Sequence, residues 1–243
     1  MAAQLNSMLN GKVQCRRMRH TVAEWACELA PHSAKPLLMR GEAMLDQPLM
    51  GHDESEAEGV LKQALDFHRQ ELEGHGVAVS SDKCGVCADA QYWGVYARAL
   101  QETGMGRRDM EAAAILRDGI EWLPLEVELY LQLGSLLERL DPNEAIELYA
   151  SFPLPPEGKP PTFDHAVIAN SSVRLLMERK EWDNPNLVPH LIVVGKVLGV
   201  LNIEKHVQVL DRENQVDVIK EAYMGVMPDF DQSAFFKSKG WIQ

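Results

Sequence analysis

The feature that most constrains this chain is a pattern of large and small residues that occurs twice between residues 93 and 137. The first copy consists of Trp93, Tyr96, Ala97 and Leu100, and the second of Tyr130, Leu133, Gly134 and Leu137. Residues three and four apart share one face of a helix, so each copy predicts a helix with an apolar stripe. The small residue within each stripe allows the backbone of a second helix to approach. The pattern therefore predicts helices that pack as antiparallel hairpins.

A second pattern marks the other helix of each hairpin. Ala112, Leu116 and Gly119 have helical spacing, and Pro124 follows Gly119 by five residues. Proline breaks the helical hydrogen bonds and restricts the residue before it, so a helix must end near Pro124. Ala26 and Pro31 have the same offset, which predicts an earlier helix whose stripe contains Met18, Val22, Trp25 and Leu29.

These spacings resemble those of the tetratricopeptide repeat family, whose units have about 34 residues. The resemblance covers residues 12–156, as half a unit followed by about three degenerate units. It implies an all-α fold, namely a right-handed α-solenoid of antiparallel helix hairpins. Arg40 stands where the family has Leu, and Gly119 and Phe152 stand where it prefers Ala. Related helical solenoids with similar hairpins are the alternative.

The resemblance also implies a concave groove, lined by the first helix of each unit, that binds peptides or helices of other proteins. Carried onto this chain, the groove positions are Leu38, Glu42, Arg98, Gln101, Leu131, Ser135, Glu138 and Arg139. We therefore expect a noncatalytic adaptor or a scaffold subunit of a larger assembly. The alternative for each of these side chains is a solvated helix face.

The remaining segments differ in character from the repeats. Residues 74–89 lack a helical period and predict an inserted loop, and residues 153–161 contain five prolines and predict a stiff connector. Residues 157–227 predict further stacked helices of the same array, among them one from Leu187 to Leu201 and a short one that Asn202 caps. Degenerate helices are therefore expected at the C-terminal end.

Residues 228–243 form a tail rich in aromatic residues and too short for a core of its own. Its candidate docking residues are Phe235, Phe236 and Trp241. Because burying a large apolar side chain is worth about 1.5–3 kcal/mol, these residues are expected to leave water. They either pack back on the repeats as a cap or dock on a partner.

Charge limits the classes of partner. The formal net charge is −12, and 24 acidic against 14 basic residues precede residue 153. Nonspecific nucleic-acid binding needs Lys and Arg to neutralise phosphates, so we expect protein partners, including ones with a basic surface, and no nucleic acid.

One cysteine pair has the spacing of a chemical site. Cys84 and Cys87 form a Cys-x2-Cys pair, and His68 and His75 lie upstream as further weak candidates for a metal. The readings that remain open are inert thiols, a metal site and a redox pair, and the last two define the alternative function. We find no phosphate loop or other catalytic pattern, and so expect no enzyme activity and no cofactor.

The sequence predicts a cytoplasmic protein. The longest apolar run, residues 187–201, contains Pro189, His190 and Lys196 and is too short and polar to span a bilayer. Residues 1–20 contain four basic residues and no acidic ones. They are either a basic first helix or an organelle-targeting segment.

Overall fold

The structure is a computed structural model. It describes residues 18–46, 54–74, 90–153, 155, 158–228 and 232–241. These residues form helices joined by turns and contain no strand, which confirms the all-α prediction. The chain divides into two compact units, unit 1 (Met1–Leu129) and unit 2 (Tyr130–Gln243).

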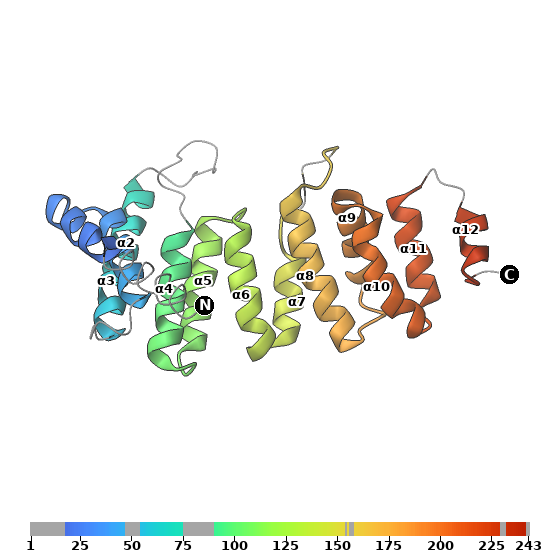
Figure 1. Ribbon diagram of the computed structural model, residues 1–243, viewed down its shortest axis with the longest axis horizontal. Coiled ribbons are helices and arrows are strands. Elements are labelled where there is room, and N and C mark those ends of the chain that lie inside the picture. Colours follow the sequence, from blue (N-terminus) through green and yellow to red (C-terminus); the bar gives the residue numbers. More distant parts are fainter. Residues whose placement is uncertain are drawn as a thin grey trace, which may run out of the picture. The chain divides into compact units, whose positions relative to one another are not determined.

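In unit 1, a helix at residues 18–29 precedes four further helices, each of at least the same length. They are α2 (Ala34–Leu45), α3 (Glu54–Gly74), α4 (Gln91–Gly104) and α5 (Asp109–Trp122). Each of α2 to α5 packs against the next in sequence, and α2 also contacts α4 (Figure 1). The break between α5 and the following helix includes Pro124, as the sequence predicts.

Glycines in unit 1 mark the places where helices meet. A Cβ atom at Gly119 in α5 would lie 2.8 Å from Cγ of Trp93 in α4, and one at Gly41 in α2 would collide with the Leu61 side chain in α3. Trp93 and Leu61 are buried, so neither can move aside into solvent. The indole of Trp93 thus occupies the space that a side chain at position 119 would need.

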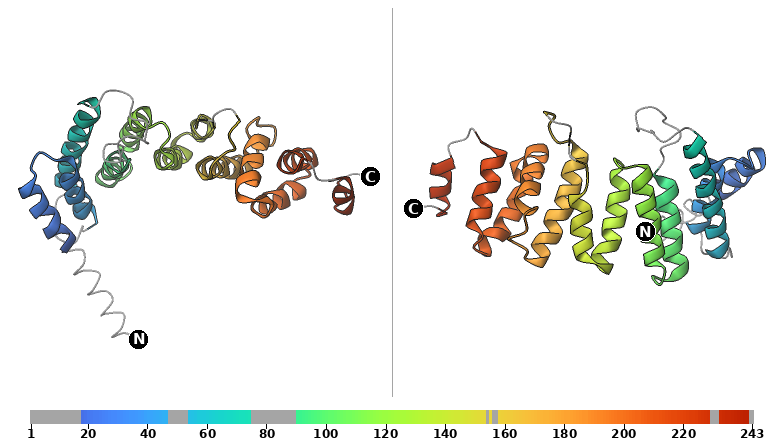
Figure 2. Two further views of the ribbon diagram at one scale, coloured as in Figure 1. Left: turned by 90° about the horizontal axis from the view of Figure 1, so that it is seen from above. Right: turned by 180° about the vertical axis from the view of Figure 1, so that it is seen from behind.

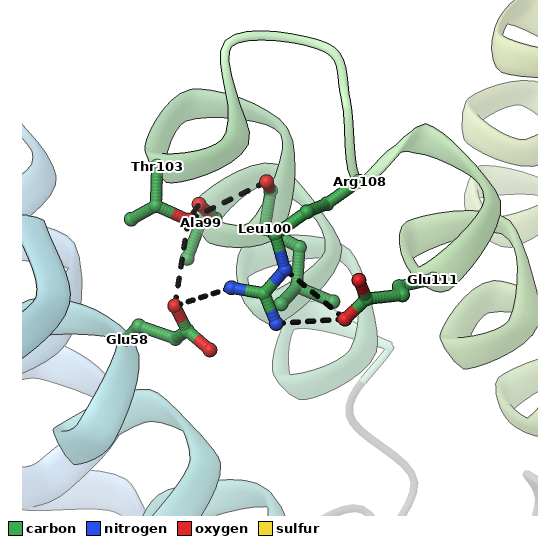
Figure 3. Close-up of polar contacts among 6 residues, drawn as sticks. All are labelled: Glu58, Ala99, Leu100, Thr103, Arg108 and Glu111. Atoms are coloured by element: carbon green, nitrogen blue, oxygen red, sulfur yellow. Dashed lines mark hydrogen bonds and ion pairs between the residues drawn. The ribbon is translucent and has the colours of Figure 1, made fainter.

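An arginine ties the loop between α4 and α5 to the neighbouring helices (Figure 3). Arg108 donates to Glu58 of α3 at 2.7 Å and to Glu111 of α5 at 2.8 Å, and Thr103 lies 3.4 Å from the same Glu58 oxygen. Hydrogen bonds to Glu111 and Glu58 raise the pKa of Arg108 above its ordinary value. The loop between α4 and α5 is therefore anchored to α3 and α5 through Arg108.

Unit 2 contains most of α6 and all the later helices. They are α6 (Val127–Leu140), α7 (Pro142–Ala150), α8 (Phe163–Arg179), α9 (Leu187–Leu198), α10 (Val200–Arg212), α11 (Val216–Val226) and α12 (Gln232–Ser238). Asp141 caps α7 by accepting from the backbone N–H groups of Asn143 and Glu144, with Pro142 at the first helical position. The described residues between α7 and α8 are not helical, consistent with a proline-rich connector.

Packing within unit 2 again depends on glycine. Gly134 of α6 lies under the Tyr149 ring of α7, where no Cβ fits. Between α9 and α11 the close contacts are reciprocal, because Gly195 faces Val226 and Gly225 faces Ile192. Residues 157–227 thus contain helices that pack on one another, with α9 against α8, α10 and α11, and their membership of one repeat array stays a prediction.

One predicted boundary is wrong. The helix predicted over residues 187–201 ends at Leu198, and Asn202 lies inside α10 rather than at its start. Gly199 separates the two helices with φ of +89°, a value that side chains disfavour and glycine adopts freely. Asn202 instead donates from its side chain to the Leu198 carbonyl.

Candidate functional site

The helix at residues 18–29 exposes a continuous apolar stripe. Met18, Val22, Trp25 and Leu29 are 62%, 48%, 61% and 87% exposed. Their spacing of four, three and four residues is that of a coiled-coil seam, which packs against another helix. The other large apolar side chains exposed in the structure lie on separate elements or alone, so this stripe is the most contiguous such feature among the described residues.

The opposite face of this helix holds it in place. Ala23 is fully buried, and Ala26, Cys27 and Ala30 are half-buried. Arg19 forms an ion pair at 3.2 Å with Asp46, which also pairs with Arg98 of α4 at 3.2 Å. The helix therefore presents its small side chains to the rest of unit 1 and its large ones to solvent. Figure 2 shows the ribbon of this helix beside that of α2.

A hollow extends the stripe toward α2. It has a volume of about 290 Å³ and is lined by Met18, Arg19, Val22, Met39 and Glu42. Met39 is itself 39% exposed. The stripe and Met39 thus form one apolar surface, which we call the N-terminal apolar face: Met18, Val22, Trp25, Leu29 and Met39.

A second hollow lies beside the same helix, with a volume of about 500 Å³. Its lining combines Glu24, Glu28, Arg40 and Cys27. Burial raises the pKa of the Cys27 thiol, so this cysteine stays protonated at neutral pH and is a poor nucleophile. The second hollow therefore offers charge rather than thiol chemistry.

The rim of the N-terminal apolar face is acidic. Its two arginines are already matched, because Arg19 pairs with Asp46 and Arg40 pairs with Glu56 at 3.4 Å. Glu28 and Glu42 form no ion pair with any residue that the structure describes. The unmatched charges along this surface are thus carboxylates, which favour a basic partner.

The predicted groove residues of unit 1 fall in different environments. Leu38 is 1% exposed, so it belongs to the core and does not lie on an accessible face. Glu42 lines the hollow beside the N-terminal apolar face. Arg98 is exposed but engaged with Glu102 at 2.7 Å as well as with Asp46, and Gln101 is half-buried nearby in α4.

The four predicted groove residues of unit 2 all lie on α6. Ser135 and Arg139 are exposed, and Leu131 is half-buried. Glu138 accepts a hydrogen bond from the Tyr149 hydroxyl at 2.8 Å and pairs with Arg174 at 2.5 Å. Burial, together with the Glu138 hydrogen bond, raises the pKa of Tyr149. Glu138 thus serves the packing of α6, α7 and α8.

The residues of the predicted metal or thiol site are mostly outside the described part of the chain. Cys84, Cys87 and His75 lie outside the described residues, so the metal or thiol site stays a prediction. His68 is fully buried and stacks on Tyr92, with ring centroids 4.1 Å apart and planes within 9°. In the described ranges, no group of three His, Cys, Asp or Glu residues has the geometry to hold a metal ion.

The aromatic tail packs back on its own unit. Phe236 and Trp241 are 6% and 9% exposed, and Phe235 is half-buried. All three rings surround Tyr223 of α11, with centroid distances of 5.3 to 6.2 Å. Trp241 also donates from its indole N–H to Asp211 of α10 at 2.6 Å. The tail has the arrangement of a cap.

The spacing of residues 18–29 predicts the apolar stripe but not the direction it faces. From that spacing alone, Met18, Val22, Trp25 and Leu29 are expected to pack against a neighbouring helix of the same chain. The signal that could have shown otherwise is the second stripe of Ala23, Ala26 and Ala30 on the opposite side, since small residues mark close helix contacts. Neither stripe alone tells which is inside.

Comparison with known proteins adds no further assignment. No protein-family model matches this sequence, and no curated protein matches it. Among the helices that the structure describes, none combines the length and apolarity needed to cross a membrane. The candidate site therefore stands on the geometry of unit 1 alone.

Proposed function

We propose that this chain is a noncatalytic protein-interaction adaptor that binds an amphipathic helix of another protein on its N-terminal apolar face. The carrying observation is the exposed stripe of Met18, Val22, Trp25 and Leu29 at coiled-coil spacing. A partner helix laid along this stripe would bury the apolar side chains that unit 1 leaves in water, which is the helix-in-groove mode of recognition.

The charges favour a partner helix with basic residues beside its apolar face. Glu28 and Glu42 carry the unmatched charge at the rim, and the whole chain has a net charge of −12. A second copy of this chain would bring the same carboxylates and the same negative charge. Electrostatics therefore supports a basic partner over self-association.

The tetratricopeptide-like solenoid is the architecture that we infer for this adaptor. Support comes from the order of packing, from the break that contains Pro124, and from glycines placed at helix crossings. On this proposal, the exposed groove positions are further partner contacts, Arg98 within unit 1 and Ser135 and Arg139 within unit 2. Glu42 is a groove position that also lines the hollow beside the N-terminal apolar face.

The test uses the full chain and two synthetic helical peptides. One has Leu on one face and Lys on the other, and its matched control has Glu in place of Lys. We expect the Lys peptide to bind and to change the fluorescence of Trp25, compared with a Trp25→Phe variant that isolates its signal. Replacing both Glu28 and Glu42 by Gln should weaken that binding about tenfold, because each exposed pair is worth up to about 1 kcal/mol.

The control variant replaces Glu73 and Glu121, which are exposed elsewhere in unit 1, and should bind like the unaltered protein. Equal binding of the Lys and Glu peptides, or binding of neither, would overturn the proposal. Sedimentation that shows a stable dimer, lost on Trp25→Ser, would assign the face to a second copy instead.

A further inference from the structure

Unit 2 contains a cavity that the adaptor function does not use. Its volume is about 250 Å³, and it lies among the end of α7, the connector, α8 and α9. Most of its wall is apolar, with Phe152, Ile168 and Ile192 among the contributors. The polar lining includes the imidazoles of His165 and His190 and the side chain of Lys196. Apolar walls with a few convergent polar groups are typical of small-molecule sites.

The hydrogen bonding of His165 fixes which nitrogen carries its proton. The backbone N–H of Thr162 donates to Nδ1 of His165 at 3.1 Å, so Nδ1 is the acceptor and Nε2 carries the hydrogen. The ring of Phe152 meets the imidazole edge-on with centroids 5.4 Å apart, which holds its orientation. Nε2 is buried and has no hydrogen-bond partner among the described residues. His165 therefore lines the cavity and holds a buried donor with no acceptor among the described residues.

His190 and Lys196 come from α9. Nδ1 of His190 is likewise buried without a hydrogen-bond partner in the described chain. Burial lowers the pKa of His190, so its ring is neutral at pH 7. Lys196 is exposed, and no ion pair joins it to a described carboxylate. The cavity is thus lined by two imidazoles whose unpaired nitrogen atoms are buried, and by Lys196, an exposed cation with no ion pair to a described residue.

A buried donor without a partner is unfavourable, and an acceptor that reached it from the cavity would remove that cost. We propose that this cavity binds a small apolar carboxylic acid. Its hydrocarbon part would contact Phe152 and Ile168, and its carboxylate would accept from His165 Nε2–H and face Lys196. A ligand with an ammonium group in place of the carboxylate offers no acceptor and is repelled by Lys196. The site should therefore bind carboxylates more tightly than amines of the same chain length.

The experiment titrates the full-length protein with octanoate and, as the matched probe, octylamine, by calorimetry. We expect octanoate to bind and octylamine to bind at least tenfold more weakly. His165→Phe keeps a ring against Phe152 but removes the donor, so octanoate binding should weaken about tenfold. Lys196→Gln should weaken it by up to about fivefold, the range of one exposed charge pair.

Lys237→Gln is the matched control. Lys237 is exposed on α12, so this substitution removes one positive charge from a place that does not line the cavity. It should leave octanoate affinity unchanged. Lys196 is exposed, so its variant tests the site without risk to the fold, and thermal unfolding of His165→Phe separates lost binding from lost structure. Equal affinity for the two probes, no octanoate binding at millimolar concentration, or an effect of Lys237→Gln equal to that of Lys196→Gln would overturn the proposal.

Discussion

The C-terminal end of unit 2 buries its large side chains, whereas the N-terminal end of unit 1 exposes them. Trp241 is 9% exposed and hydrogen-bonded to Asp211, while Trp25 is 61% exposed. Terminal helices of a stacked array need a polar outer face or a cap for solubility. The tail supplies that cap in unit 2. No described part of unit 1 caps the helix at residues 18–29, so its outer face is the candidate for an interaction.

The largest expected effect comes from the covered end. Trp241→Ala removes the ring that packs on Tyr223 and leaves Asp211 without its indole donor. We expect a loss of about 3 kcal/mol in the free energy of unfolding, the lower part of the range for buried Trp to Ala. Denaturant unfolding measures it. A loss below about 0.5 kcal/mol would mean that the tail is not a cap and would restore it as a docking element.

Acid should weaken the same unit through His206 of α10. Burial lowers the pKa of this imidazole from 6.5 to about 4. The unfolded chain therefore binds the proton first, so stability is full above pH 6.5 and falls as the pH drops toward 4. Between pH 6.5 and pH 5 the loss is about 1.6 kcal/mol for this group, since the unfolded imidazole is already half protonated at pH 6.5 and each pH unit of separation is worth about 1.4 kcal/mol.

The variant His206→Asn isolates this contribution. It should be less stable than the unaltered protein at pH 7 but should lose less stability between pH 6.5 and pH 5 in urea titrations. An unchanged pH dependence in the variant would show that His206 is not the group that titrates.

Substitutions at two glycines of α2 and α3 test whether the N-terminal end of unit 1 is loosely packed. Gly41→Ala puts a Cβ against the buried Leu61 side chain, whereas at Gly59 a Cβ meets nothing within 4 Å. We expect Gly41→Ala to cost about 1–2 kcal/mol from overpacking. Gly59→Ala should instead stabilise by up to about 1 kcal/mol, because Ala favours helix over Gly. Equal unfolding curves for the two variants would indicate that α2 and α3 separate easily and that the apolar exposure reflects loose structure.

The smallest expected effect is at Trp25. Trp25→Ala should change the unfolding free energy by less than about 0.5 kcal/mol, since the side chain is mostly in water. Binding of an apolar dye to the native protein should fall at the same time. If this variant destabilises as much as Trp241→Ala, the two ends are equivalent and the N-terminal apolar face is part of the core.

Much of the local structure was predictable because its causes are local. The helix break that includes Pro124 and the cap at Asp141 follow from residue types whose backbone preferences hold in any context. The break between α9 and α10 was predictable in principle, since Gly199 marks it, but the apolar run continues through the glycine and hid the boundary.

The position of Leu38 depended on more than one helix. If α2 packed on one neighbouring helix, Leu38 would lie at the edge of the contact and be partly exposed. Because α2 contacts both α3 and α4, more of its circumference is buried, and Leu38 is in the core. Offsets taken from the repeat pattern cannot include that second neighbour. In the same way, spacing marks Glu138 as a groove position, whereas Tyr149 and Arg174 engage it from two later helices.

The sequence by itself determined that the chain is helical, that a helix ends near Pro124, and that Gly134 lies where two helices approach closely. It also determined that residues 18–29 carry one stripe of large apolar side chains and one of small ones. Only the tertiary structure decided which stripe faces inward. The physical reason is that periodicity defines the faces of a helix but not their neighbours. Close approach of backbones favours Ala23 at the contact, even though it leaves Trp25 and Leu29 in water.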